Sequence, residues 1–120
     1  MFGLDVDTDV SGLAGCRLES IDLTEHQVQL RLDSPNGIRL SIESAFAITP
    51  GGGDRSVFER PRDAAQALAD RLGVEVVDAR VAEPGTLTLR WHDGSLLEVF
   101  DSNEHYESYQ IHLGERLIVV

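Results

Sequence analysis

Apolar and polar residues alternate along two neighbouring stretches of the chain, and this pattern predicts a β-hairpin. Val28, Leu30 and Leu32 recur with a period of two, which places their side chains on one face of a half-buried strand. The same alternation returns in residues 38–42. Between these stretches, residues 34–37 read Ser-Pro-Asn-Gly, and an Asn-Gly pair tolerates the positive φ angles of a tight hairpin turn.

One amphipathic helix is predicted over residues 61–72. Pro61 suits the first helical position, because its missing N–H costs nothing there, and Gly73 offers a C-terminal stop. The apolar face is expected to consist of Ala65, Leu68 and Leu72. A helix of this length is marginal in isolation, so we expect it to dock against a sheet.

The segments before and after this helix resemble each other. The matching segments are 15–18 with 73–76, 28–32 with 87–91, and 36–40 with 93–97. Residues 45–49, 108–113 and 115–120 are further predicted strands. These patterns predict an α+β domain in which two similar antiparallel β half-units, related by internal duplication, form a curved sheet or a small barrel with one connecting amphipathic helix.

The length of 120 residues suits one hydrophobic core, so we expect a single domain over 1–120. Its predicted parts are a flexible N-terminus (1–12), a first β unit (13–49), a loop and helix (50–73) and a second β unit (74–120).

Charge adds the strongest functional constraint. The 21 acidic residues outnumber the ten basic ones, which are all Arg, so the net charge is −11 and no lysine chemistry is available. This field repels nucleic acids and anionic membrane surfaces, and neither is expected as a partner. A basic protein or a cation is favoured electrostatically, although the charge also serves solubility alone.

Cysteine content and the N-terminal sequence indicate a cytoplasmic protein. Cys16 is the one cysteine, which excludes an intramolecular disulfide, and it is expected to be a buried, inert thiol. The first residues contain neither a basic region nor an apolar run of the kind found in a signal peptide.

The candidate chemical motifs are weak. Residues 5–12 fail the pattern of a calcium loop, and Gly51-Gly52-Gly53 is expected to be a flexible connection without the lysine of a phosphate loop. His92, Asp93 and Ser95 cluster in a hairpin turn without the features of a nucleophile elbow. We therefore expect no catalytic residue, no metal site and no cofactor, and hence no enzyme.

The segment 92–115 carries six acids without any Arg, together with three His. We expect it to form a partner-binding face on one sheet and its loops, with Tyr106 and Tyr109 at the rim and Trp91 in the core. The candidate partner-binding residues are Asp93, Glu98, Asp101, Glu104, Tyr106, Glu107 and Tyr109.

Residues 90–99, Arg-Trp-His-Asp-Gly-Ser-Leu-Leu-Glu-Val, and 106–111, Tyr-Glu-Ser-Tyr-Gln-Ile, carry a resemblance. They resemble a small bacterial family of unknown function whose members contain aromatic-x-Asp-Gly-Ser-x-Leu followed by Tyr-Glu-small-aromatic-x-Ile. Its small acidic members look like immunity proteins of toxin systems, which inhibit a toxin by covering it. The resemblance thus implies a binding protein and transfers no catalytic residue.

The leading hypothesis is a protein-binding domain that uses an acidic face to bind a basic protein such as a toxin. The alternatives are a small-molecule or cation-binding module with its site between the halves, and a structural homo-oligomer formed through an edge strand or the apolar C-terminus.

Overall fold

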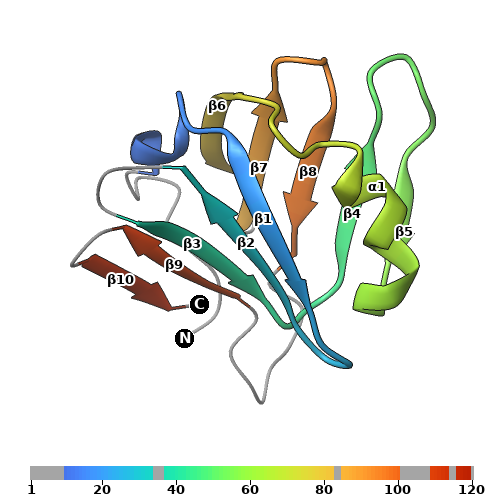
Figure 1. The fold of residues 1–120 in the computed structure, drawn as a ribbon, viewed down its shortest axis with the longest axis horizontal. Coiled ribbons are helices and arrows are strands. Elements are labelled where there is room, and N and C mark those ends of the chain that lie inside the picture. Colours follow the sequence, from blue (N-terminus) through green and yellow to red (C-terminus); the bar gives the residue numbers. More distant parts are fainter. Residues whose placement is uncertain (1–9, 34–36, 83–84, 101–108, 114–115, 120) are drawn as a thin grey trace.

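A computed structural model gives the fold of the protein. It describes residues 10–33, 37–82, 85–100, 109–113 and 116–119, with only the backbone of 112–113 and 116–119. The fold is mostly β, with one short α-helix (Figure 1).

Two five-stranded antiparallel sheets make up the structure (Figure 1). The first has the order β1-β2-β3-β9-β10, with bounds Leu18–Leu23, Val28–Leu32, Ile38–Ile42, Tyr109–Leu113 and Arg116–Val119. The second has the order β5-β4-β8-β7-β6, with bounds Ser56–Phe58, Phe46–Thr49, Leu96–Val99, Thr86–Trp91 and Val76–Ala82.

The hairpin predicted from the alternating pattern is confirmed as β2 and β3. Leu30 pairs with Leu40, and Leu32 pairs with Ile38, so the apolar positions of both strands share the buried face. Gly37 has a φ of +67°, the conformation that a glycine at this turn supplies at low cost. Local alternation was therefore sufficient to predict this unit.

The prediction of one curved sheet or a barrel is wrong. After β3 the chain crosses to the other sheet, where the β4–β5 hairpin pairs with β8; after β8 it crosses back, and the β9–β10 hairpin pairs with β3. The described strands therefore form two separate sheets, and they do not close into a barrel. Because the chain crosses between the sheets twice, each half of the chain ends in a hairpin that completes the sheet begun by the other half.

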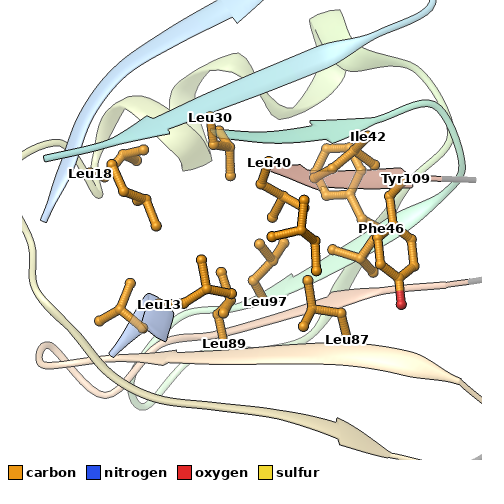
Figure 2. Close-up of a cluster of buried hydrophobic side chains, with 14 of the residues drawn as sticks. Leu13, Leu18, Leu30, Leu40, Ile42, Phe46, Leu87, Leu89, Leu97 and Tyr109 are labelled. Carbon is orange, nitrogen blue, oxygen red and sulfur yellow. The ribbon is translucent and has the colours of Figure 1, made fainter. Parts of the chain in front are cut away.

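The hydrophobic core lies between the two sheets. Leu30 and Leu40 of the first sheet point toward Leu89 and Leu97 of the second (Figure 2). All four side chains are almost fully buried. In a sandwich of this kind, the burial of apolar surface between the two sheets makes the main contribution to the free energy of folding.

The edge strands β1 and β6 meet at one corner of the sandwich. Arg17 and Glu75 form an antiparallel bridge there. Backbone hydrogen bonds extend the contact on both sides, from Val76 N–H to the Cys16 carbonyl at 2.7 Å and from Gly73 N–H to the Leu18 carbonyl at 2.8 Å. These bonds connect the two sheets through the backbone as well as through the core.

The helical segment differs from the prediction in its length and its buried face. It begins as a 3-10 helix, η2 (Pro61–Ala64), and continues as α1 (Ala65–Ala69), so it ends before Leu72. The tighter 3-10 turn brings Pro61 and Ala64 inward together with Leu68. The next buried residue is Arg71, in place of the predicted Leu72. A second 3-10 turn, η1 (Ser11–Leu13), packs against β6.

The helical register generates a stability prediction. Leu68→Ala should cost about 2–5 kcal/mol in the free energy of unfolding, because the side chain is fully buried. Leu72→Ala should cost less than about 1 kcal/mol, because Leu72 is 47% exposed. Urea unfolding of both variants measures the difference. Equal losses would show that the apolar face is the one predicted from the sequence.

Candidate functional site

The acidic segment predicted to form one face is divided between the two sheets. Glu98 lies on β8 of the second sheet, whereas Tyr109 begins β9 of the first sheet. The expectation of one sheet and its loops is therefore wrong, because the chain crosses the sandwich between these two strands. Asp101, Glu104, Tyr106 and Glu107 lie outside the described residues.

Tyr109 occupies the core and not the rim of a surface. Its side chain is fully buried, and its hydroxyl donates a hydrogen bond of 2.9 Å to the carbonyl of Gly85 in the β6–β7 turn. This bond connects the first sheet to the second, and Figure 2 shows Tyr109 among the buried side chains. The sequence held a signal for this burial, because Tyr109 continues the inward alternation with Ile111, and the two residues pair with Ile42 and Leu40.

Glu98 is compensated by a cation. Its Oε1 atom lies 2.9 Å from Nε of Arg55, in an ion pair that is partly exposed to solvent. The Arg55 guanidinium also lies over the ring of Phe100, 5.5 Å from its centroid. The negative charge of Glu98 is thus partly neutralised within the chain.

Asp93 organises the turn between β7 and β8. Its Oδ1 accepts a hydrogen bond of 2.9 Å from the backbone N–H of Ser95 and a second, short one from the Ser95 hydroxyl. Its Oδ2 lies 3.4 Å from Nη1 of Arg71, which is 8% exposed. The Ser95 hydroxyl is buried, and its partner is Asp93. The arrangement stabilises a turn.

The electrostatic balance at Asp93 favours the ionised carboxylate. Burial alone would raise the pKa of Asp93, but the two hydrogen bonds from Ser95 and the nearby Arg71 guanidinium outweigh it, so the pKa is lowered from its ordinary value. Within the described chain, Nε of Arg71 and Nε1 of Trp91 are buried without a hydrogen-bond partner. Trp91 itself is 1% exposed, which confirms the prediction that it belongs to the core.

Cys16 and Gly51 both lie at closely packed positions. Cys16 is 9% exposed, and burial followed by the charge of Asp33 raises the pKa of its thiol, in accordance with a buried cysteine. The glycine run at 51–53 forms the turn between β4 and β5, where a Cβ on Gly51 would lie 2.5 Å from the carbonyl oxygen of Asp93. This close approach of two backbones requires a glycine.

A polar groove that the sequence analysis did not anticipate gathers glutamates from three separate segments. It has a volume of about 260 Å³ and is lined by Glu25, His26, Glu43, Glu59, Arg60 and Arg62. A second hollow of about 410 Å³ shares Glu59 and Arg60 with it and extends over Val57, Phe58 and Asp63.

The β2–β3 register builds one wall of the groove. Val28 pairs with Ile42, so the residues just before β2 and just after β3 lie side by side. The amide of Gln27 accordingly reaches the carboxylate of Glu43 at 3.4 Å. The sequence predicted this hairpin but not its register, so the proximity of residues 25–27 to Glu43 follows from the structure. The position of Glu59 depends on the unpredicted strand β5.

The charges around the groove are incompletely compensated. Arg60 forms an ion pair of 3.1 Å with Asp63, outside the groove wall. The nearest cation to Glu25 is the exposed His26, with 3.8 Å between Nε2 and Oε1, and this His is charged only when protonated. Glu43 and Glu59 make no ion pair within the described part of the chain. Arg62 also lines the groove, so three glutamates face one arginine that is not paired with an acid in the described chain. The groove therefore retains negative charge that an incoming cation can neutralise.

The described residues contain neither a metal-binding cluster nor a membrane-spanning helix. No three His, Cys, Asp or Glu side chains among them come together in a way that could hold a metal ion. No described helix is long and apolar enough to cross a membrane.

The state of Asp93 generates a pH prediction. Because the folded-state pKa is lowered, its interactions stabilise the fold above the unfolded pKa of about 3.9 and are lost as pH falls through the folded pKa. Asp93→Asn should lower the melting temperature at pH 7, and the gap to the wild type should close in strong acid. Thermal unfolding from pH 7 to about pH 2 measures this, with the exposed Asp54→Asn as control. A gap that stays constant with pH would contradict the assigned charge interaction.

Comparisons with known proteins place the chain in a family. No curated protein and no solved structure matches it. One family model, described as a family of unknown function (DUF6188), matches residues 10–120. The match extends over nearly the whole chain and agrees with the resemblance drawn from residues 90–99 and 106–111. The protein belongs to this family of unknown function, DUF6188.

Proposed function

We propose that the protein is a small acidic binding domain for a basic protein, and that the groove lined by Glu25, Glu43 and Glu59 contacts this partner. The observation that carries the proposal is the convergence of three exposed glutamates from distant segments on one hollow, two of them without an ion pair in the described chain. A basic side chain entering the groove would supply the missing charge.

The chemistry of the groove favours a protein over a small molecule. The adjoining hollow is lined by Val57, which is 54% exposed, and by the half-buried Phe58. Apolar contact beside a charged groove suits a protein surface that combines an anchoring side chain with a polar rim. The net charge of −11 also accelerates the encounter with a basic partner and slows the encounter with a polyanion.

A basic toxin is the first partner class that this proposal names. The chain resembles immunity proteins of toxin systems in its size and acidic charge. Such inhibitors act by covering their target, which needs a charged binding surface and no catalytic residue. Inhibition by covering therefore requires nothing of this chain beyond the groove and its surroundings.

We also infer that the two halves derive from one duplicated unit. Reading β1 to β5 and then β6 to β10 gives the same arrangement, with three strands in one sheet and a hairpin in the other. In the sequence alignment of the halves Arg17 corresponds to Glu75, and these two residues pair with each other, as counterparts on a two-fold axis do. Arg71 then stands where the first half has the buried Leu13. The ion pair from the buried Arg71 to Asp93 would be a specialisation of the second half.

The binding proposal is tested by partner recovery with matched charge variants. The tagged wild type, the groove variant Glu25→Gln/Glu43→Gln/Glu59→Gln and the control variant Glu19→Gln/Asp54→Asn/Asp70→Asn are each incubated with host lysate at low and high salt. Both variants remove three exposed acids. We expect a basic protein, identified by mass spectrometry, that binds the wild type and the control at low salt. The groove variant should bind this purified partner about tenfold or more weakly.

Two results would overturn the proposal. If the tagged protein is recovered alone at both salt concentrations, the hypothesis of a basic protein partner is excluded. Equal weakening in the groove and control variants would show that net charge, and not the groove, is responsible.

A further inference from the structure

Two arginines face each other on the outer side of the first sheet. Arg31 on β2 is directly opposite Arg39 on β3 in the ladder register. Their neighbours along each strand point inward and are buried, so both side chains project from the face that is turned away from the core. No other two like-charged residues are directly opposite each other in the registers of the described strands.

Neither arginine has an anionic partner among the described side chains. Arg31 and Arg39 make no ion pair and no side-chain hydrogen bond with the described residues. This is unexpected in a chain with 21 acids and ten arginines, where a carboxylate at a neighbouring position would be the simplest arrangement. Like charges directly opposite each other destabilise a sheet. Between these two side chains, the repulsion lowers the stability of the sheet, and an anion placed between them would relieve it.

The second sheet provides an internal comparison. Arg90 on β7 matches Arg31 in the alignment of the two halves. Its cross-strand neighbours are Asp78 on β6 and Leu96 on β8. The arginine at the matching position is thus opposite an acid in the ladder and not opposite a second arginine, and the ion pair of that acid is with Arg80. The opposed arginines are a property of the first sheet alone.

A shallow hollow accompanies the arginine pair. It has a volume of about 280 Å³ and is lined by Arg31, Gly37 and Arg39. Gly37 is exposed and carries no side chain, so the hollow is open on that side. An anion in this hollow would lie beside both arginines.

We propose that the Arg31–Arg39 pair and the hollow beside Gly37 bind a phosphate dianion, as free phosphate or as a monoester. Two planar guanidinium forks present donors that match the oxygens of a tetrahedral oxyanion. The double negative charge of this group also removes the repulsion between the two arginines. This site is independent of the glutamate groove, since it uses different residues and the opposite charge.

The size of the ligand follows from the charge of the whole protein. The field of distant charges is screened within about 10 Å at 0.1 M salt, so a small ion at this site responds mainly to the two arginines. A long polyanion would extend over the surrounding acidic surface and be repelled. The site is therefore assigned to a small phosphate compound and not to nucleic acid.

Thermal unfolding at constant ionic strength tests the site. In chloride alone, Arg39→Gln should melt about 1–4 °C higher than the wild type, because the repulsion is relieved. About 20 mM phosphate, replacing chloride, should raise the melting temperature of the wild type by roughly 5 °C, as expected for a Kd of about 1 mM. Arg39→Gln and Arg31→Gln should lose this response, while Arg90→Gln should retain it.

Backbone amide NMR and a second ligand complete the experiment. Titration with inorganic phosphate should shift the amides of Arg31, Gly37 and Arg39 and leave that of Arg90 unchanged. Glycerol 3-phosphate forms the second arm: tighter binding than inorganic phosphate indicates a monoester, and weaker binding indicates the free ion. The proposal is wrong if neither compound shifts these amides, or if the Arg39→Gln variant responds to phosphate as the wild type does.

Discussion

The β3–β9 and β4–β8 ladders hold the two halves of the chain together. Each half builds three strands of its own sheet and leaves one edge open, and a hairpin from the other half covers that edge. Pairs such as Ile42 with Tyr109 and Phe46 with Val99 therefore join residues that are more than fifty positions apart. Neither half can bury its apolar face alone, so the sandwich must form as one cooperative unit, and its non-local pairing favours slow folding.

Sequence reasoning succeeded where the determining interactions are local. The alternation around Val28–Leu32 and the Asn-Gly turn predicted the β2–β3 hairpin and its inward-facing positions. The crossing between sheets carried no comparable signal, because only three residues separate β3 from β4 and the apolar alternation resumes immediately after them. A contact between distant parts of the chain helps to direct the crossing: the Ser44 hydroxyl donates a hydrogen bond of 2.6 Å to the carbonyl of Phe100. Such a contact becomes visible only when both partners have been placed.

The same distinction applies to the candidate site. The segment 92–115 was predicted to form one face because it carries six acids and no Arg. Residues that are close in sequence nevertheless separate when the chain changes sheets between β8 and β9. Glu25 and Glu43 are distant in sequence and converge because the hairpin register brings the ends of β2 and β3 together. Glu59 depended on β5, a three-residue strand too short to show a period. Register was thus a better guide to the site than local charge density.

Net charge describes this surface poorly, because the arrangement of ion pairs decides where charge remains. Exposed pairs such as Arg55–Glu98 and Arg80–Asp78 contribute little to stability, but they remove negative charge from the second sheet. Along the β2–β3 hairpin the uncompensated charges separate: glutamates gather beside the end where Val28 pairs with Ile42, and the two arginines face each other toward the Gly37 turn. The electrostatic potential is thus negative at one end of the hairpin and positive at the other. This difference would fix the orientation in which a charged partner docks as well as the rate of association. The uneven placement of a few arginines therefore constrains recognition more than the excess of acids does.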